Sequence, residues 1–267
     1  MAQPVCSVVI PTYNAAHIIG DQLGALSAQL DAPIFEVIVA DNGSTDDLVN
    51  VLASWAQRLP LLRRVDASRA KGVSVARNEG IRAAATDKIL ICDADDLVSP
   101  GWVRSFSSAL ADHAFVGGPV ETSRLSGPSA AWVPIPERTQ ELLESWEGLK
   151  FPSGGNLGLH RRVWEAVGGF AEDYPAGAEE IDFAWRARDA GYPAAYVPEA
   201  LLHYRIRTSL KGVLRQQYNS GRGTATLFSK WRPQEVPVKS LLVVSTTNFC
   251  CWAASPSAVG PTPDEGG

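Results

Sequence analysis

The sequence predicts an α/β protein with a mostly parallel β-sheet that is flanked by helices on both faces. Two observations predict this fold class. Short, nearly continuous apolar runs alternate with amphipathic helical segments along the first third of the chain, which is typical of parallel strands joined by crossover helices. Three of these runs also end in polar clusters, and parallel sheets of this kind bind ligands at the carboxyl ends of their strands. The clusters are Thr12-Tyr13-Asn14, Asp41-Asn42 and Asp93-Ala94-Asp95-Asp96.

The first half of the chain is expected to alternate strands and helices. Apolar runs bounded by turn residues predict strands at residues 5–10, 35–40, 61–65 and 88–92. Apolar residues about one turn apart predict helices, carried by Ile18, Ile19, Leu23, Leu26 and Leu30, by Leu48, Val51, Leu52 and Trp55, and by residues 73–85. Ser44 or Thr45 is expected to cap the second of these helices.

The second half of the chain is less regular. Helices are expected at residues 100–110, 161–167, 179–190 and 209–230, and strands at 115–120, 156–160, 194–197 and 201–204. Residues 123–136 are rich in Ser, Pro and Gly and predict a loop. We expect one domain over residues 1–232 and a poorly ordered tail over 233–267, because the tail has no motif and ends in a disordered composition.

Charge and cysteine content exclude several classes of protein. The 267-residue chain has a net charge of −5 and a pI near 5.4, whereas a nucleic-acid-binding domain normally has a basic face. The four cysteines lack metal-ligand spacing, and Cys6 and Cys92 lie in apolar runs, as buried thiols of a reducing compartment do. No signal peptide opens the chain, and residues 241–254 are too short and too polar to span a bilayer. We therefore expect a cytoplasmic protein with no nucleic-acid partner.

The strongest chemical signal is the acidic cluster Asp93-Ala94-Asp95-Asp96, which directly follows the apolar run at residues 88–92. Carboxylates this close repel one another unless a positive group lies against them. A divalent cation bound to a diphosphate would balance their charge, and alternation along an extended chain would point Asp93 and Asp95 to the same side. The alternative is a solvated acidic turn. Convergence of the three polar clusters at one sheet edge favours the cation site.

The ordered series of motifs resembles glycosyltransferase family 2, whose inverting enzymes have a GT-A fold with a Rossmann-like, mostly parallel sheet. The matching segments are Val8-Val9-Ile10-Pro11-Thr12-Tyr13-Asn14, Asp41-Asn42-Gly43-Ser44-Thr45-Asp46, Ala76-Arg77-Asn78, Asp93-Ala94-Asp95-Asp96, Gly154-Gly155-Asn156, Gly168-Gly169-Phe170, Glu179-Glu180-Ile181-Asp182 and Pro198-Glu199-Ala200 leading to His203. The resemblance implies the nucleotide-diphospho-sugar transferase architecture, with residues 5–120 as the nucleotide-sugar-binding half and 121–232 as the acceptor and catalytic half. It also implies metal-dependent, inverting transfer of a sugar from a nucleoside-diphosphate sugar to a hydroxyl of a glycan or lipid-linked acceptor, in the synthesis of cell-envelope polysaccharide or glycolipid.

The resemblance implies a set of donor-binding residues, namely Pro11, Thr12, Tyr13, Asn14, Asp41, Arg77, Asn78, Asp93 and Ala94. In this assignment the ring of Tyr13 stacks on the nucleobase and Asp41 accepts a hydrogen bond from a ring N–H. Arg77 and Asn78 meet the ribose or the diphosphate. Alternatives stay open: Tyr13 as an ordinary aromatic residue, Asp41 as an Asx-turn residue and Arg77 as a surface cation.

By the same resemblance, Asp93, Asp95 and His203 bind Mn²⁺ or Mg²⁺, the aspartates through oxygen and the histidine through nitrogen. The lead-in Pro198-Glu199-Ala200 favours this role for His203 over that of a core histidine. Asp96 could simply cap the following turn.

Glu180 is the expected catalytic base, with Asp182 as a second catalytic candidate. The family usually has Glu-Asp-x-Asp at this point, with the first Asp as base, and this chain has Glu179-Glu180-Ile181-Asp182. Glu retains the carboxylate but displaces it by roughly 1 Å, a shift that can matter to rate. Glu179 also stays open as the base, and these acids could instead serve only to stabilise a helix N-terminus.

Two other functional classes are disfavoured by the sequence, and a third stays open. A sugar nucleotidyltransferase needs a Gly-rich, basic triphosphate loop after the first strand, where this chain has Pro11-Thr12-Tyr13-Asn14. A dinucleotide-dependent oxidoreductase is disfavoured because no G-x-G-x-x-G follows a strand. A non-catalytic sugar-nucleotide-binding protein stays open because Glu180 departs from the family's usual residue.

The expected last helix is basic and amphipathic, with Lys211, Arg215, Arg222 and Lys230 among apolar residues. A helix of this kind either covers the core of the sheet or lies on an anionic membrane surface. Peripheral contact with the inner face of the membrane is therefore one of two interpretations of residues 209–230.

Overall fold

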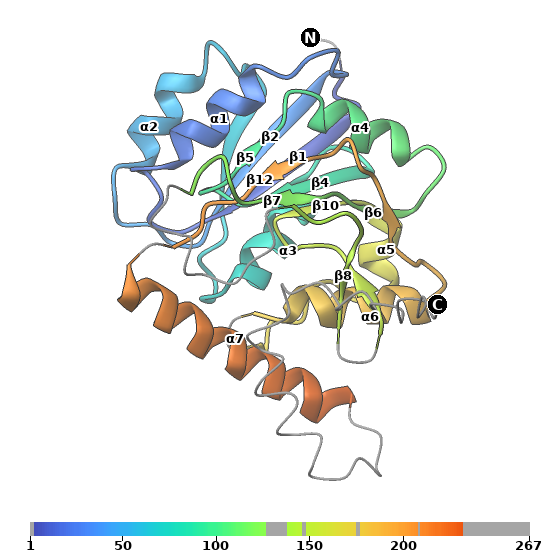
Figure 1. The fold of residues 1–267 in the computed structure, drawn as a ribbon. Helices are drawn as coiled ribbons and strands as arrows, with labels where there is room; N and C mark the ends of the chain where they lie inside the picture. The colour runs from blue at the N-terminus through green and yellow to red at the C-terminus, as the bar shows by residue number, and fades with distance from the viewer. Residues whose placement is uncertain (1–2, 127–137, 146–147, 175–176, 208, 232–267) are drawn as a thin grey trace, which may run out of the picture.

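The computed structural model describes residues 3–126, 138–145, 148–174, 177–207 and 209–231. It has the predicted α/β architecture, a large and mostly parallel sheet with helices packed on both faces (Figure 1). The predicted tail at 233–267 and most of the predicted loop at 123–136 lie outside the described residues.

Strands and helices alternate regularly at first and become shorter in the second half. The strands are β1 (Cys6–Thr12), β2 (Phe35–Asp41), β3 (Leu62–Asp66), β4 (Lys88–Cys92), β5 (Leu97–Val98), β6 (Phe115–Gly117), β7 (Val120–Glu121), β8 (Leu143–Glu144), β9 (Lys150–Phe151), β10 (Asn156–His160), β11 (Ala195–Tyr196) and β12 (Leu202–His203). The helices are α1 (Ile19–Ser27), α2 (Leu48–Trp55), α3 (Val73–Ala83), α4 (Trp102–Ala109), α5 (Arg161–Ala166), α6 (Glu179–Asp189) and α7 (Leu210–Trp231).

The main sheet has the strand order β11-β6-β10-β4-β1-β2-β3. β1 pairs in parallel with β2 and β4, and β2 with β3, while β10 runs antiparallel between β4 and β6. The register places Thr12 beside Asp41, so the carboxyl ends of these parallel strands share one edge, as predicted. A second sheet, β5-β12-β7, begins just after the acidic cluster.

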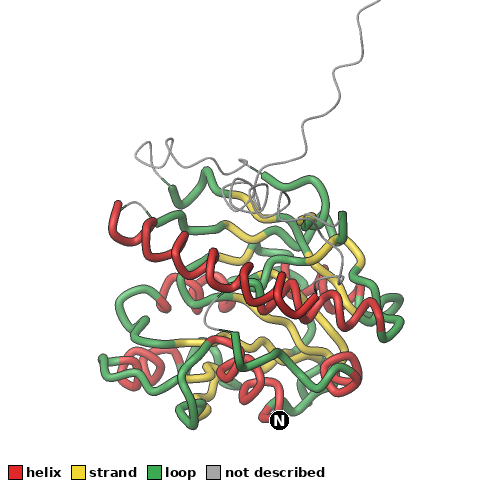
Figure 2. Tube along the Cα trace, turned by 90° about the horizontal axis from the view of Figure 1, so that it is seen from below, coloured by secondary structure: helices red, strands yellow, loops and turns green. Residues whose placement is uncertain are grey.

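The two faces of the main sheet are covered by different helices (Figures 1 and 2). Successive side chains of a strand point to opposite faces. Val8 and Ile10 accordingly pack in a core with residues of α1, α2 and α4, whereas Val9 packs in a core with residues of α3, α5 and α6. The near-continuous apolar character of β1 follows from this burial on both faces.

Three local predictions are wrong. The first helix ends at Ser27, so Leu30 lies in the following loop and is 61% exposed. Neither Ser44 nor Thr45 caps α2, which begins without a side-chain cap, because both residues bond to the turn after β1 instead. Residues 115–120 form two strands in different sheets rather than one, since Pro119 lacks the N–H that a continuous strand would need.

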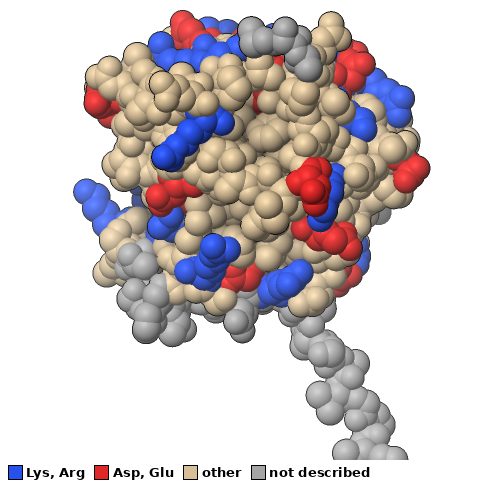
Figure 3. Space-filling view, turned by 90° about the horizontal axis from the view of Figure 1, so that it is seen from above, with Lys and Arg blue, Asp and Glu red and all other residues tan. Residues whose placement is uncertain are grey.

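The described residues include no helix that could cross a membrane, because each is too short or too polar. On the face in Figure 3, basic and acidic side chains are interspersed and form no continuous basic surface. The opposite face, in Figure 2, is crossed by the 22-residue helix α7.

Candidate active site

The turns after β1 and β2 are fastened to each other. Asn14 has a left-handed backbone, with φ of 51°, a conformation that Asn tolerates better than most residues. Its N–H donates to Ser44 Oγ at 2.9 Å, and its Oδ1 accepts from the Thr45 N–H at 2.8 Å. Pro11 and Thr12 are buried at the end of β1. These residues form a rigid rim at the sheet edge.

Asp41 lies beside this rim and is 1% exposed. Its Oδ1 accepts from the Ser44 N–H at 2.8 Å, the Asx-turn contact, and its Oδ2 accepts from Arg64 Nε at 2.8 Å and Nη2 at 2.7 Å. Burial favours the neutral acid, but the hydrogen bonds from Ser44 and Arg64 outweigh it and hold the pKa of Asp41 below its ordinary value. Asp41 is therefore a fixed, ionised acceptor.

Tyr13 projects from the rim with 55% of its surface exposed. Lys71 Nζ lies 4.4 Å from the centroid of its ring and donates to Asn42 O at 2.9 Å. A cation over the face of an aromatic ring is attracted by its quadrupole. Tyr13 is thus an open aromatic surface flanked by a lysine, not a core residue.

The acidic cluster is a turn, so the predicted alternation of Asp93 and Asp95 along an extended chain is wrong. β4 ends at Cys92, before the first aspartate. Gln22 of α1 holds the turn closed: its Nε2 donates to Asp93 O and its Oε1 accepts from the Val98 N–H, both at 3.0 Å. The cluster is consequently presented by a braced turn at the end of the sheet.

The carboxylates of this turn are incompletely neutralised. Asp93 Oδ1 lies 3.7 Å from Arg77 Nη2, and Asp95 Oδ2 lies 3.8 Å from Arg207 Nη2, both near the outer limit of an ion pair. Burial, opposed by Arg77 and reinforced by the charge of Asp95, raises the pKa of Asp93. Ala94 is buried between the two acids.

Asp96 ties the acidic turn to the chain that follows β12. Its Oδ1 accepts from the Arg205 N–H at 2.9 Å, and Arg205 Nε donates to Asp95 O at 2.9 Å. The second oxygen, Oδ2, is buried without a hydrogen-bond partner. Burial, together with the charges of Asp95 and Asp93, raises the pKa of Asp96 well above its ordinary value. Asp96 is a bracing residue rather than an open ligand.

Arg77 joins the acidic turn to helix α6. It is 3% exposed, which excludes the surface-cation interpretation. Its Nη1 lies 2.8 Å from Glu179 Oε1, in addition to the contact with Asp93. Gly154 and Gly155 pack directly against this assembly: an added Cβ would lie 2.8 Å from Arg77 Nη2 at Gly154 and 2.6 Å from Asp93 Oδ2 at Gly155. The absence of side chains at Gly154 and Gly155 therefore makes room for the side chains of Arg77 and Asp93.

Glu180 lies in the first turn of α6, partly exposed, immediately after the buried Glu179. Burial and the charge of Glu179 raise the pKa of Glu180 to about 8, although the guanidinium of Arg77 opposes them. A carboxylate with a pKa near the working pH is suited to accept a proton during reaction. Its environment thus fits a general base.

Asp182, the second catalytic candidate, is 1% exposed and fully engaged. Its Oδ2 lies 2.7 Å from Arg186 Nη2, and its Oδ1 accepts from the Tyr174 hydroxyl at 3.2 Å and from Trp231 Nε1 at 3.0 Å. These contacts fasten the end of α7 to α6, and they leave Asp182 no open side toward a substrate.

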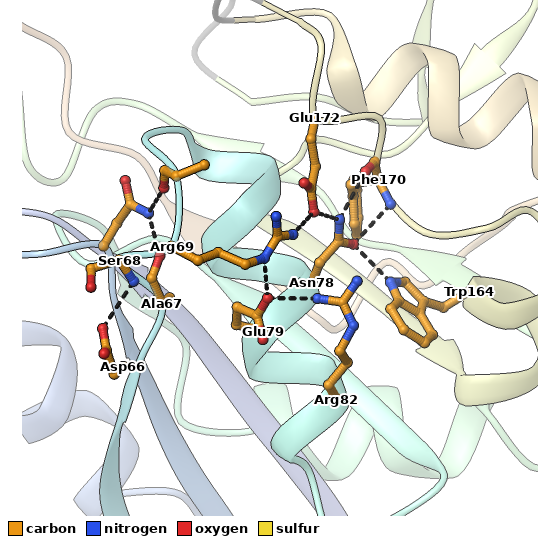
Figure 4. Close-up of polar contacts among 12 residues, drawn as sticks. Asp66, Ala67, Ser68, Arg69, Asn78, Glu79, Arg82, Trp164, Phe170 and Glu172 are labelled. Carbon is orange, nitrogen blue, oxygen red and sulfur yellow. Dashed lines mark hydrogen bonds and ion pairs between the residues drawn. The ribbon is translucent and has the colours of Figure 1, made fainter.

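Asn78 is part of a polar network that fastens α3 to residues 168–172 (Figure 4). Its Nδ2 donates to Phe170 O and to Glu172 Oε1, and its Oδ1 accepts from Trp164 Nε1 and the Phe170 N–H. Both donors and both lone pairs of the amide are thereby used. The network continues on the surface through Arg69, which pairs with Glu172. The hydrogen-bonding groups of Asn78 are therefore committed to this turn and not to the strand-end edge.

His203 is buried in β12, and both of its ring nitrogens have protein partners. Nδ1 lies 2.6 Å from Glu121 Oε2 and Nε2 lies 3.0 Å from Arg124 Nη1, so Nδ1 carries the proton that Glu121 accepts and Nε2 accepts from Arg124. Among the described residues, no group of three or more His, Cys, Asp or Glu side chains is already arranged to hold a metal ion. Metal binding by Asp93, Asp95 and His203 stays a prediction.

Models of two protein families match this chain. The model of glycosyl transferase family 2 matches residues 7–168, and that of glycosyl transferase family group 2 matches residues 88–259. The chain belongs to glycosyl transferase family 2.

Relatives of this chain include the glycosyltransferase AglE of Haloferax volcanii. The two are 27% identical over 223 residues, which cover 82% of this chain and 73% of the relative. The validoxylamine A glucosyltransferase of Streptomyces hygroscopicus subsp. limoneus is 39% identical over 112 residues, which are 42% of this chain and only 24% of the relative.

Solved structures of glycosyltransferases with the GT-A fold resemble this chain. The mannosyltransferase PcManGT from Pyrobaculum calidifontis, in complex with GDP-Man and Mn²⁺, has a TM-score of 0.62 and 26% identity over 93% of this chain and 70% of its own. S. aureus TarS 1–349 in complex with UDP-GlcNAc has a TM-score of 0.60 and 16% identity over 91% of this chain and 79% of its own. The predicted family and fold are confirmed.

Several residues that brace the site were not predicted from the sequence. Gln22 had a signal, because it is a polar residue on the apolar stripe of Ile19, Leu23 and Leu26, where burial demands a partner. Arg64 and Arg205 had none, since their partners Asp41 and Asp96 are far away in sequence and only the fold brings them together.

Proposed function

We propose that this chain transfers a sugar from a nucleoside-diphosphate sugar to an acceptor hydroxyl, with a divalent cation and with inversion at the anomeric carbon. Membership of glycosyl transferase family 2 supports the reaction class. The observation that carries the proposal is the buried Arg77, which contacts both Asp93 of the acidic turn and Glu179 beside the candidate base. Arg77 thereby holds Asp93, on the proposed donor side, close to Glu179, on the proposed acceptor side.

The donor would lie along the rim formed by the ends of β1 and β2. Tyr13 offers an open ring for stacking on a base, and Asp41 offers a fixed carboxylate for a ring N–H. The guanidinium of Arg77 would supply positive charge toward the diphosphate. The complex of PcManGT with GDP-Man supports a nucleotide sugar as the donor.

The acidic turn fits a divalent cation. Asp93 and Asp95 offer hard oxygen ligands, and their nearest cations, Arg77 and Arg207, lie 3.7 and 3.8 Å away, so the turn keeps unbalanced negative charge. Mn²⁺ or Mg²⁺ bound there would stabilise the charge that develops on the departing diphosphate. His203 would join as a ligand only by giving up its contact with Arg124. The Mn²⁺ in PcManGT supports this assignment.

Glu180 would act as the general base that takes the proton of the attacking hydroxyl. Inversion follows from a single in-line displacement, in which the hydroxyl attacks from the face opposite the nucleotide. Glu180 is preferred over Asp182 and Glu179 because Asp182 is buried among three partners and Glu179 is bound to Arg77.

The acceptor and the setting belong to the same proposal. We expect a glycan or lipid-linked hydroxyl, in the synthesis of cell-envelope polysaccharide or glycolipid, and a cytoplasmic enzyme that can reach the inner face of the membrane. The acceptor side would be formed by residues 121–232.

A donor screen tests the proposal. A panel of UDP-, GDP- and TDP-sugars is added with Mn²⁺, and the thermal midpoint is measured, because a ligand that binds the native state raises it by mass action. One donor is expected to stabilise the protein only with the cation present, and proton NMR of its product is expected to show the inverted anomer. Retention of configuration, or stabilisation by no donor, would contradict the proposal.

A further inference from the structure

Helix α7 packs on the protein along one side, and its apolar contacts with the core lie at its C-terminal end, where Leu227 is buried and Trp231 packs against the same core. Its buried residues are Gly223, Thr224 and Leu227, and Gln216 on the same side donates to the Tyr204 hydroxyl at 2.8 Å. The helix also approaches the main body through small residues: a Cβ on Gly177 would lie 3.3 Å from the Cα of Ser220. Over residues 216–224 of α7, polar and small side chains therefore face the protein.

The outer face of the first half of α7 also carries large apolar side chains. Leu210, Leu214 and Tyr218 are 65%, 60% and 67% exposed. They are spaced four residues apart, which places them in one stripe along the helix. Such a stripe on the surface of a protein usually marks an interaction site, because leaving it in water is unfavourable.

The charges around this stripe have one sign. Residues 210–231 contain Lys211, Arg215, Arg222 and Lys230 and no Asp or Glu, although the whole chain has a net charge of −5. Lys211, Arg215 and Arg222 are exposed, and the Arg222 guanidinium lies 5.8 Å from the ring centroid of Tyr218. The apolar stripe is thus bordered by cations on a protein that is otherwise acidic.

We propose that the outer face of α7, formed by Leu210, Lys211, Leu214, Arg215, Tyr218 and Arg222, docks on an anionic lipid bilayer. The leucines and the tyrosine ring enter the interface between headgroups and acyl chains, and the cations pair with lipid phosphates and carboxylates. A second copy of the chain fits this face less well, because a symmetric contact would set these cations against one another. The long helix crosses the near face in Figure 2.

Docking through α7 would fix the orientation of the active site relative to the membrane. The inner face of α7 touches Gly177, which directly precedes Ala178 and helix α6 with Glu180. A bilayer against the outer face would therefore lie close to the side from which an acceptor hydroxyl reaches Glu180. Docking depends only on α7, so it is independent of the proposed transfer reaction.

Vesicle flotation of the full-length chain tests the proposal. The protein is mixed with phosphatidylcholine vesicles, with and without one-third phosphatidylglycerol, at low and high salt. Binding is expected only with phosphatidylglycerol, and it should weaken at high salt because screening shortens the reach of the charges. Arg215→Gln/Arg222→Gln is expected to reduce binding about fivefold for each charge removed, and Leu214→Ser/Tyr218→Ser at least about tenfold.

Matched substitutions elsewhere serve as controls. Val49 is 58% exposed on α2 and Arg162 is exposed on α5, so Val49→Ser and Arg162→Gln should leave flotation unchanged.

Equal binding to both kinds of vesicle, or none, would overturn the proposal. So would a dimer in light scattering that Leu214→Ser/Tyr218→Ser dissolves, since the face would then be an interface between copies. Unfolding of that variant would show that the chain itself covers the stripe. Donor turnover on a soluble acceptor should be equal in all variants, which separates this test from that of the proposed transfer.

Discussion

Arg77 Nη1 and Glu179 Oε1 lie 2.8 Å apart, and neither side chain is more than 6% exposed. The two residues belong to α3 and α6, on opposite sides of the acidic turn in sequence. Their contact therefore positions the candidate base, one residue after Glu179, relative to Asp93. A buried pair of this kind adds specificity of position more than net stability.

Breaking this pair from one side should be strongly destabilising. Arg77→Met leaves the Glu179 carboxylate buried without its partner and should lower the free energy of unfolding by about 3–5 kcal/mol. Arg77→Met/Glu179→Gln should lose less than the sum of the two single changes, because the carboxylate of Glu179 is removed together with its partner. Urea unfolding of the three variants measures the coupling.

The surface provides the control for that cycle. Arg69, which pairs with Glu79 and Glu172, is 48% exposed, and Arg69→Met should change the free energy of unfolding by no more than about 1 kcal/mol. Simple additivity of Arg77→Met and Glu179→Gln would mean that the buried pair does not act as a unit.

Asn78→Ala should destabilise the fold without weakening donor binding. The change leaves Trp164 Nε1 and the Phe170 N–H without an acceptor, at about 1–3 kcal/mol for each buried group. Asn50→Ala, which removes only an exposed contact with Asp47, is the control. A large rise in the donor dissociation constant at unchanged stability would instead support the donor-binding role first predicted for Asn78.

Asp96 should make stability fall as pH rises. Burial holds the pKa of Asp96 well above its value in the unfolded chain, so the folded state binds more protons and loses stability above the unfolded pKa. Asp96→Asn lacks this effect. The difference in free energy of unfolding, variant minus wild type, should therefore grow as pH rises from the unfolded pKa toward the folded pKa, by up to about 1.4 kcal/mol per pH unit. Urea unfolding with a chelator present measures it, and a difference independent of pH would show that Asp96 is ionised throughout.

The rate of transfer should rise with pH. A general base must be deprotonated, and the pKa of Glu180 is raised to about 8, so the acidic limb of the kcat/KM profile should have its midpoint near that pH. Glu180→Asp, which restores the usual family residue, should keep a pH-dependent limb, because a carboxylate stays in the first turn of α6 beside Glu179. A flat profile between pH 6 and pH 9 would exclude Glu180 as the base.

Sequence alone predicted the sheet because its strands are buried on both faces and read as apolar runs, as in β1 and β4. It predicted the strand-end clusters for the same reason, since Thr12, Asp41 and Asp93 follow those runs directly. It could not predict the turn geometry of Asp93 to Asp96, because Gln22 and Arg205, which brace that turn, are remote in sequence. Gly154 and Gly155 were visible as a motif, but only the structure shows that they make room for Arg77 and Asp93.

Asn78 and Asp182 illustrate a second limit. Both belong to motifs of glycosyl transferase family 2, and a motif does not distinguish a residue that meets substrate from one that holds the site together. The contacts make that distinction: every polar atom of the Asn78 side chain is used within the fold, and Asp182 is enclosed by Tyr174, Arg186 and Trp231.

The most direct test of the central claim compares donor turnover and donor affinity in the wild type and in Glu180→Gln, with Mn²⁺ and the donor found by screening. The substitution keeps the size of the side chain and removes its ability to take a proton. The proposed role of Glu180 as the base predicts that turnover falls by about 10²-fold or more while the donor dissociation constant is unchanged. Equal turnover in the two proteins, with the donor bound, would contradict it.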